Sequence, residues 1–324
     1  MSRIRIVVVA FAVLVAQAAG AQQSASLDAA VRLYEARQYG AARQAFQAVT
    51  AAEPRNARAY YYLGRVTFGQ GDGARAAEQF EKATQLDPRN ADYHFWLGQA
   101  YGREAQHLSK FRAAFLAKKI RHEFETAVAL DPEGVDGRSG LLSYYLIAPG
   151  ILGGSVDKAR EQAREIARRN PMKGLLADGA IAEREKDMAG AERAYSAAVA
   201  QFPDSAFTYY TLGNMYQRTK QYDKALALYD RLRARMPNER PVLYYSGRAA
   251  ALSGQNLPRA EQELTAYLRL PLEDTDPPLA SAHNYLGLTY EKQGRRDLAR
   301  REYETSVQLD PERDDAKQGL DRVK

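Results

Sequence analysis

The sequence of 324 residues contains no cysteine. Disulfides and thiolate metal sites are therefore excluded, and so is the lipid-modified amino terminus of a lipoprotein, which needs a cysteine. The four histidines do not form the H-E-x-x-H pattern of a zinc protease, and no glycine-rich stretch ends in the G-K-[ST] of a phosphate-binding loop. Because no nucleophile–base motif appears either, the sequence predicts no enzyme, no cofactor and no metal site.

Long hydrophobic runs are also missing, except at the amino terminus. Arg3 and Arg5 precede an apolar run from Ile6 to Ala16, and Ala19-Gly20-Ala21 follows it. The run is about half of the roughly 20 residues that cross a bilayer, which favours a cleaved signal peptide over an uncleaved membrane anchor. We therefore expect residues 1–21 to be removed on export, the protein to be periplasmic or secreted, and no transmembrane segment to remain.

A strong excess of charge of one sign is lacking too. The formal net charge is +6, and the loss of Arg3 and Arg5 with the signal peptide changes it to +4. Nucleic-acid binding proteins carry a larger and more clustered basic excess. The sequence therefore predicts no nucleic-acid partner.

What the sequence does contain is a repeated pattern, clearest between Ala206 and Pro237. Large, small and proline residues recur there at fixed spacing, namely Tyr209, Leu212, Gly213, Tyr216, Ala225, Tyr229 and Pro237. The spacing predicts two helices: Gly213 lets the second helix approach the first, and Tyr229 fills the layer between neighbouring repeats. One such helix pair cannot bury its own apolar face, so the pattern predicts that neighbours repeat it.

The same spacing recurs along the whole chain, and no strand-like alternation appears. We therefore expect an all-α fold of about eight helix-turn-helix repeats forming a single solenoid over residues 22–324. The expected repeats cover residues 23–56, 57–90, 91–134, 135–173, 174–205, 206–239, 240–274 and 280–313, with a capping helix over 314–324. Asn56 and Asn90 follow the prolines that end two repeats, where the next helix needs a capping residue.

The third repeat is longer than the others because of a basic stretch from Arg103 to Lys119. Its large apolar residues have helical spacing and are expected in the core, namely Leu108, Phe111, Phe115 and Leu116. We interpret the stretch as lengthened helices with a solvated basic face. The alternative is that this face contacts anionic lipid or lipopolysaccharide as a peripheral envelope contact.

The fourth repeat is interrupted by residues 147–155, with the sequence IAPGILGGS. We expect Pro149 to end one helix, the glycines to supply positive φ angles, and Asp157 to cap the next helix. The alternative is a loop that folds over a binding site.

These residues resemble the tetratricopeptide repeat family across nearly all of the expected mature chain. The resemblance implies helix pairs stacked in a right-handed superhelix, with a concave groove lined by the first helices that binds a peptide or a partner helix. The long third repeat and the stretch YYLIAPGILGGSVDKA are similar to a subset of exported bacterial members. That similarity implies no particular activity.

In this family the second, fifth, ninth and twelfth residues of each first helix face the groove. The resemblance therefore implies a partner-binding groove that contains Arg58, Tyr61, Arg65, Phe68, Phe95, Gln99, Tyr210, Asn214, Gln217, Asn284 and Glu291. The family's lysine-and-asparagine clamp for an acidic carboxyl terminus is not reproduced. Asn214 matches one clamp asparagine, but Tyr210 occupies the position of the clamp lysine.

The positions of the histidines favour packing or surface roles over catalysis or metal binding. His94 and His283 occupy the large-residue position of a first helix, while His107 and His122, in or beside the third-repeat insertion, are interpreted as surface residues rather than a metal pair.

The functional hypothesis is a non-enzymatic scaffold or adaptor of the cell envelope that binds a protein segment in the groove. The alternative is a small-molecule or lipid-handling accessory subunit of an envelope transport system. The partner, the pathway and the oligomeric state are left open.

Overall fold

The computed structural model describes residues 26–106, 108–270, 276–311 and 313–324. These residues form α-helices and one short 3-10 helix, and they contain no β-strand. The expected signal peptide, His107 and residues 272–275 of the proline-rich segment lie outside the described residues. None of the helices that are described is both long enough and apolar enough to cross a membrane.

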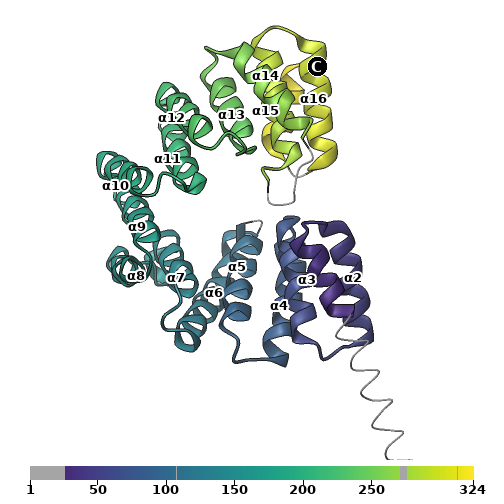
Figure 1. Cartoon of the computed structure of the whole chain (residues 1–324), viewed down its shortest axis with the longest axis vertical. Helices are drawn as coiled ribbons and strands as arrows, with labels where there is room; N and C mark the ends of the chain where they lie inside the picture. Colours follow the sequence, from purple (N-terminus) through teal and green to yellow (C-terminus); the bar gives the residue numbers. More distant parts are fainter. Residues whose placement is uncertain (1–25, 107, 271–275, 312) are drawn as a thin grey trace, which may run out of the picture. The chain divides into compact units, whose positions relative to one another are not determined.

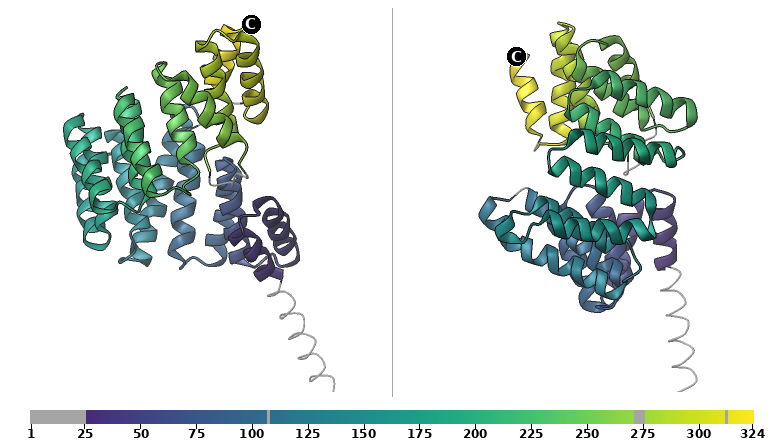
Figure 2. Two further views of the ribbon diagram at one scale, coloured as in Figure 1. Left: turned by 45° about the horizontal axis from the view of Figure 1, so that its top comes forward. Right: turned by 90° about the vertical axis from the view of Figure 1, so that its left-hand side faces the viewer.

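The chain divides into two compact units, with the boundary between Glu165 and Ile166. The first unit contains a helical segment over residues 26–35, α2 (Tyr39–Ala52), α3 (Ala57–Gly69), α4 (Gly73–Leu86), α5 (Ala91–Gln106), α6 (Lys110–Leu130), α7 (Asp136–Ile147), η1 (Gly150–Leu152) and most of α8 (Val156–Arg169). The second unit contains α9 (Pro171–Arg184), α10 (Met188–Gln201), α11 (Ala206–Arg218), α12 (Tyr222–Arg235), α13 (Val242–Ser253), α14 (Leu257–Leu268), α15 (Leu279–Lys292), α16 (Arg296–Leu309) and α17 (Asp314–Arg322). Within each unit, consecutive helices pack side by side as antiparallel pairs (Figures 1 and 2). An all-α fold is what the repeat spacing predicts.

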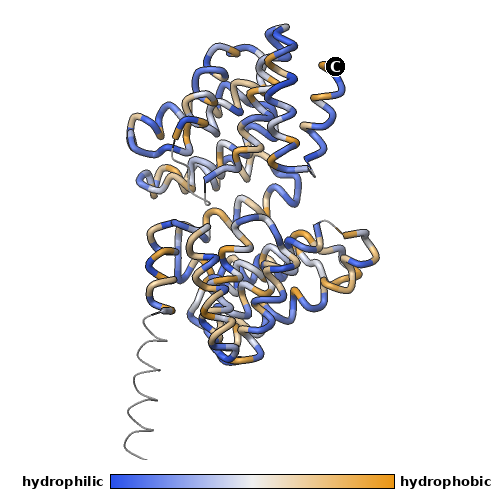
Figure 3. Tube along the Cα trace, turned by 90° about the vertical axis from the view of Figure 1, so that its right-hand side faces the viewer, coloured by the Kyte–Doolittle hydropathy of each residue, from blue (hydrophilic) through white to orange (hydrophobic). Residues whose placement is uncertain are grey.

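Short polar side chains determine where several helices begin. The Asn56 side chain accepts a hydrogen bond from the Ala59 amide at 3.1 Å, and Asn90 accepts one from the Asp92 amide at 3.0 Å. Both asparagines therefore act at helix starts as predicted. Hydrophobic residues recur along each helix with hydrophilic ones between them, which leaves one face of each helix for packing (Figure 3).

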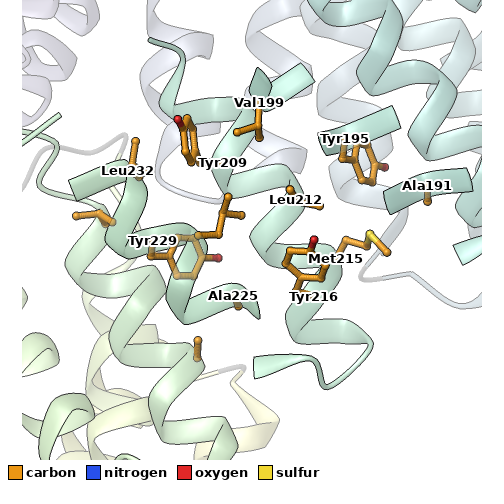
Figure 4. Packing of buried hydrophobic residues seen from close by; sticks show 13 residues of the cluster. Ala191, Tyr195, Val199, Tyr209, Leu212, Met215, Tyr216, Ala225, Tyr229 and Leu232 are labelled. Carbon is orange, nitrogen blue, oxygen red and sulfur yellow. The ribbon is translucent and has the colours of Figure 1, made fainter. Parts of the chain in front are cut away.

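The core of the second unit shows how the repeat pattern encodes packing. Tyr229 of α12 is fully buried and lies beside Leu212 of α11 (Figure 4). Gly213 makes this approach possible, because a Cβ atom at that position would lie 2.2 Å from the Tyr229 hydroxyl oxygen. Glycine in α11 and the aromatic residue in α12 therefore fit each other as the spacing predicts.

The third helix pair is longer than the others and differs from expectation. α6 has 21 residues, whereas α4 has 14. Leu116 packs against the apolar cluster of α4 and α5, but Phe111 and Phe115 are 74% and 68% exposed. The prediction that both phenylalanines belong to the core is wrong. With 3.6 residues per turn, Phe111 and Phe115 lie on the face of α6 opposite to Phe124, which packs against Gly98 of α5 and Gly140 of α7.

The loop after α7 is a tight turn. Gly153 has a φ angle of +95°, which residues with a side chain rarely adopt, as predicted, whereas Gly150 and Gly154 do not have positive φ angles. The Tyr144 hydroxyl donates a hydrogen bond to the Leu152 carbonyl oxygen and so fastens the turn to α7. The predicted cap is wrong: the Ser155 hydroxyl accepts the Lys158 amide at 3.3 Å, whereas Asp157 lies inside the first turn of α8.

Candidate functional site

In the first unit, aromatic side chains from three helices surround the guanidinium group of Arg65. Its central carbon lies 3.9 Å from the ring centroid of Trp96 on α5, 5.6 Å from that of Tyr61 on α3 and 5.8 Å from that of Tyr34 on segment 26–35. Arg65 also donates a hydrogen bond of 2.7 Å to the Tyr61 hydroxyl. We call these four residues the Arg65 cluster. The contacts hold a cation against ring faces, an arrangement that is favourable by about 0.5 to 2 kcal/mol per ring.

The other predicted residues of this unit lie around the Arg65 cluster. Phe68 packs edge-to-face with Trp96 at 5.3 Å and lies beneath the guanidinium of Arg103 at 3.8 Å. Phe95 packs edge-to-face with Trp96 at 5.5 Å and borders a cavity of about 40 Å³. Ligand pockets for small molecules usually have about 300 Å³ or more, so this cavity is too small for one.

The remaining two predicted residues of this unit are Arg58 on α3 and Gln99 on α5. Arg58 is exposed, lies 5.6 Å from the Tyr62 ring centroid and forms an ion pair of 3.8 Å with Asp28. Gln99 follows Phe95 by one turn of α5 and is half-buried. The structure therefore brings Tyr61, Arg65 and Phe68 together near Trp96, which Phe95 also contacts.

The second unit contains a similar arrangement centred on Arg248 of α13. The Arg248 guanidinium donates a hydrogen bond of 2.8 Å to the Gln217 side-chain oxygen and another to the Asn214 side-chain oxygen, both on α11. Its central carbon lies 5.4 Å from the ring centroid of Tyr245 and 6.0 Å from that of Tyr285 on α15. Tyr244 lies 5.6 Å away as well. We call Arg248 and these five neighbours the Arg248 cluster.

Tyr210 extends the Arg248 cluster along α11. Its ring stacks on Tyr245 with centroids 4.1 Å apart, and its hydroxyl donates a 2.7 Å hydrogen bond to Glu239. Burial raises the pKa of Tyr245, and burial together with the bond to Glu239 raises the pKa of Tyr210. Both hydroxyl groups therefore stay protonated at neutral pH and can donate hydrogen bonds.

Arg65 and Arg248 share an electrostatic property. Among the residues that the structure describes, no carboxylate lies within 4.0 Å of either guanidinium group. Their neighbours are neutral amide and hydroxyl oxygens and ring faces. Each cation therefore keeps its full charge next to a half-buried aromatic surface, where it can attract a carbonyl or carboxylate oxygen of a bound chain.

Asn284 and Glu291 have their polar groups occupied by the last helix. Asn284 is buried and donates a 2.9 Å hydrogen bond to Asp315 of α17. The Glu291 carboxylate accepts hydrogen bonds from Arg322 of α17 at 2.7 and 2.9 Å, and from the Tyr303 hydroxyl at 2.5 Å. These two residues anchor α17 in the structure, and their predicted contact with a partner stays a prediction.

Acidification is expected to loosen α17 before the rest of the second unit unfolds. The hydrogen bonds from Arg322 hold the pKa of Glu291 below its ordinary value of 4.5. The unfolded chain takes up this proton near pH 4.5 and the folded chain only at lower pH. The stabilisation by this carboxylate is therefore complete above about pH 4.5 and is lost as the pH falls through the lowered pKa.

Hydrogen exchange of the α17 amides, corrected for the intrinsic rate at each pH, measures this loosening. Glu291→Gln should expose α17 already at neutral pH and remove most of the acid dependence. Glu304→Gln, a change at an exposed residue of α16, serves as the matched control. Equal protection of α17 in the wild type and in Glu291→Gln across this range contradicts the prediction.

Two histidines form hydrogen bonds with a glutamate on the helix that is paired with their own. His94 Nδ1 lies 2.6 Å from Glu123, and His283 Nδ1 lies 2.7 Å from Glu302. The bond to Glu123 raises the pKa of His94. His122 is exposed, and no group of three or more potential ligands that could hold a metal ion occurs among the described residues.

Trp96, Tyr245, Arg248 and Tyr285 were not among the sequence-predicted site residues. Arg248 could have been found, because Gly247 has the same place in its helix as Gly64 in α3 and Gly213 in α11. Counting one residue onward then gives Arg248 as the equivalent of Arg65 and Asn214. The seventh repeat matches fewer signature positions than its neighbours, so this equivalence is not evident from the sequence. The three aromatic residues lie one position off the groove pattern and are revealed only by packing.

Comparisons with known proteins agree with this architecture. Sequence models of the family described as "Tetratricopeptide repeat" match residues 27–88 and 66–117, residues 182–245 and residues 280–313, together more than half of the chain. No curated protein matches the chain in sequence. Among solved structures, yeast Tom70 is similar with a TM-score of 0.65 at 16% identity, over 88% of this chain and 58% of Tom70. This chain thus spans little more than half the length of Tom70.

Two further solved structures are similar at lower scores. A tetratricopeptide repeat protein from Parabacteroides merdae has a TM-score of 0.49 at 12% identity, over 93% of this chain and 98% of its own. The APC/C hetero-tetramer Cut9-Hcn1 has a TM-score of 0.49 at 16% identity, over 88% of this chain and 52% of the other. At such identities the likeness concerns the fold alone.

Proposed function

Because this chain belongs to the tetratricopeptide repeat family, we propose that it is a non-enzymatic scaffold that binds a segment of a partner protein. Its fold is an all-α solenoid of helix-turn-helix repeats, and such a fold suggests a protein-interaction surface rather than a catalytic site. A fold does not identify a partner. The side chains on the first helices therefore have to carry the proposal.

The observation that carries it is the Arg248 cluster. Tyrosine and arginine dominate the energetics of protein interfaces, because they bury a large area and also form hydrogen bonds. Here Tyr210, Tyr245 and Arg248 are half-buried and held by fixed neighbours, so little conformational entropy is lost when a partner binds. Gln217 and Asn214 position the guanidinium group through its Nε and Nη2 atoms, which leaves Nη1 to donate to a carbonyl or carboxylate oxygen of the partner. The Arg65 cluster offers the first unit the same chemistry.

The location of the protein is part of the proposal. The amino-terminal sequence has the basic residues, short apolar run and small residues of a signal peptide. We therefore place the scaffold in the cell envelope, in the periplasm, where its partner would be another envelope or exported protein.

The proposal is tested by affinity capture followed by quantitative binding. The chain from residue 22 onward is immobilised, since every described contact lies within residues 26–324. Envelope extract is passed over the wild type and over Arg248→Ala, and captured proteins are identified and purified. Arg248→Ala should weaken binding of the partner by about 30-fold, as expected for an interface residue worth about 2 kcal/mol. Calorimetry with the purified partner measures this change.

Arg301→Ala is the matched control, because it removes the same charge from an exposed position on the second helix of a pair. Circular dichroism establishes that both variants fold. An unchanged dissociation constant in Arg248→Ala and in the equivalent Arg65→Ala would show that the partner binds elsewhere. A chain that captures no protein beyond what the uncoated matrix captures contradicts the scaffold proposal itself.

A further inference from the structure

The four most exposed of the large hydrophobic side chains described belong to one part of the first unit. Phe111 and Phe115 on α6 are 74% and 68% exposed, and Ile147 and Ile151 in the segment after α7 are 80% and 95% exposed. Single exposed apolar residues are common on protein surfaces and need no explanation. Four on neighbouring elements indicate a contact surface.

The phenylalanines lie on the part of α6 that the repeat does not need. α6 has 21 residues against 14 in α4, and its first seven residues, 110–116, include both rings. The rings contact each other edge-to-face with centroids 5.2 Å apart. Because they are four residues apart, they lie on the same face of the helix and form one apolar ridge. Because both rings are largely exposed, the ridge projects from the helix.

The loop with Ile151 is held close to the same helix. A Cβ atom at Gly153 would lie 3.0 Å from an Arg121 guanidinium nitrogen, and η1 contacts α6. The hydrogen bond from Tyr144 to the Leu152 carbonyl oxygen fixes the turn on its other side. Ile151 is therefore presented on a fixed turn beside α6.

The charge around the ridge has one sign. Residues 108–122 contain Lys110, Arg112, Lys118, Lys119 and Arg121 and no acidic residue. Lys119 and Arg121 are balanced by Glu81 at 3.7 Å and Glu125 at 3.5 Å. Arg112 and Lys118 are exposed, and no carboxylate among the described residues lies within 4.0 Å of either. Lys118 is three residues beyond Phe115, so it shares the exposed face with the ridge.

We propose that this surface, formed by Phe111, Phe115, Ile151, Arg112 and Lys118, binds the surface of an anionic lipid bilayer. Apolar rings that project from a helix insert at the boundary of headgroups and acyl chains, and cations beside them bind the anionic headgroups. An acidic protein partner would also satisfy the charge, but two rings that project from a helix need a partner with a matching hollow. A bilayer yields around them. The surface is separate from the Arg65 and Arg248 clusters, so the proposal does not rest on partner binding there.

Vesicle co-sedimentation of the chain from residue 22 onward tests this proposal. The vesicles contain equal parts of phosphatidylglycerol and phosphatidylcholine, with phosphatidylcholine alone as the neutral comparison. Phe111→Ser/Phe115→Ser should weaken binding to the anionic vesicles by at least about tenfold, because the variant no longer has the apolar area that each ring buries in the bilayer. Arg112→Gln/Lys118→Gln should weaken it by about tenfold at low salt and reduce its salt dependence. Phe207→Ser, which alters a phenylalanine that is 60% exposed in the second unit, should leave binding unchanged.

A second measurement separates insertion from charge attraction alone. The chain has a single tryptophan, so Phe115→Trp adds one reporter at the ridge. Its emission should shift to shorter wavelength on anionic vesicles and be quenched by brominated acyl chains, whereas Phe207→Trp should show neither effect.

Equal sedimentation of the wild type and Phe111→Ser/Phe115→Ser overturns the proposal. So does a dimer in sedimentation velocity that this double variant dissociates without any vesicle binding, because the occupant is then a second copy of the chain. Absence of binding to anionic vesicles overturns it too and points to an acidic protein partner.

Discussion

Replacing Tyr229 with alanine is expected to cost the second unit about 3 to 5 kcal/mol of folding free energy, the range for deleting a fully buried aromatic side chain. The ring of Tyr229 is completely buried in the cluster that joins α10, α11, α12 and α13. The ring packs against Gly213. Glycine has no side chain that could fill the space left when the ring is removed. Alanine would therefore leave a cavity that the helices can close only by shifting toward each other.

The hydroxyl group of Tyr229 adds a smaller contribution. It accepts a 2.8 Å hydrogen bond from the Gln217 side chain, whose oxygen in turn binds Arg248. Tyr229→Phe keeps the ring and removes this bond, so it should cost about 1 kcal/mol and weaken partner binding through the loosened Arg248. Urea unfolding measures the loss of folding free energy in Tyr229→Ala and Tyr229→Phe. Tyr222→Ala, a change at a half-buried tyrosine of the same helix, serves as the comparison. Equal losses for Tyr229→Ala and Tyr222→Ala would contradict the packing described here.

The repeat pattern was sufficient to predict the fold because each signature position specifies a local contact. The positions of Leu212, Gly213 and Tyr229 recur from repeat to repeat. The first belongs to the packed face of a helix, the second allows a close approach of two helices, and the third fills the layer between helices. The capping roles of Asn56 and Asn90 were predictable for the same reason: the donor and acceptor lie within three residues of each other. Interactions within one helix pair can therefore be recovered from spacing.

Features that depend on distant neighbours were not predictable in this way. The helical spacing of Phe111 and Phe115 identifies a stripe, but the spacing does not show that Leu116 instead faces the cluster of α4 and α5. Ser155 rather than Asp157 caps α8, because the turn at Gly153 fixes where the helix starts. The position of Arg248 follows from the repeat count, yet its contacts with Asn214 and Tyr285 connect three repeats.

A buried ionic network connects the helices that carry the Arg248 cluster. Glu263 of α14 is 5% exposed and accepts hydrogen bonds from Arg233 of α12 at 2.5 Å and from Arg259 at 3.2 Å. Arg259 also binds both carboxylate oxygens of Asp230 on α12, at 2.6 and 3.0 Å, and the Ser246 hydroxyl of α13 at 2.8 Å. Three consecutive helices therefore share one network of alternating charges.

Replacing Glu263 with alanine is expected to destabilise the second unit by about 3 kcal/mol, the lower end of the range for removing one partner of a buried ion pair. The loss is limited because Arg233 reaches solvent and Asp230 still neutralises Arg259. Replacing both charges together, as Glu263→Leu/Arg259→Leu, should recover most of the lost stability, because neither charge is then left buried alone. Urea unfolding of Glu263→Leu, Arg259→Leu and the double variant forms a double-mutant cycle with an expected coupling of about 2 kcal/mol. Additive losses in this cycle would mean that Glu263 and Arg259 act independently, and that the network does not hold α12, α13 and α14 in register beneath Arg248.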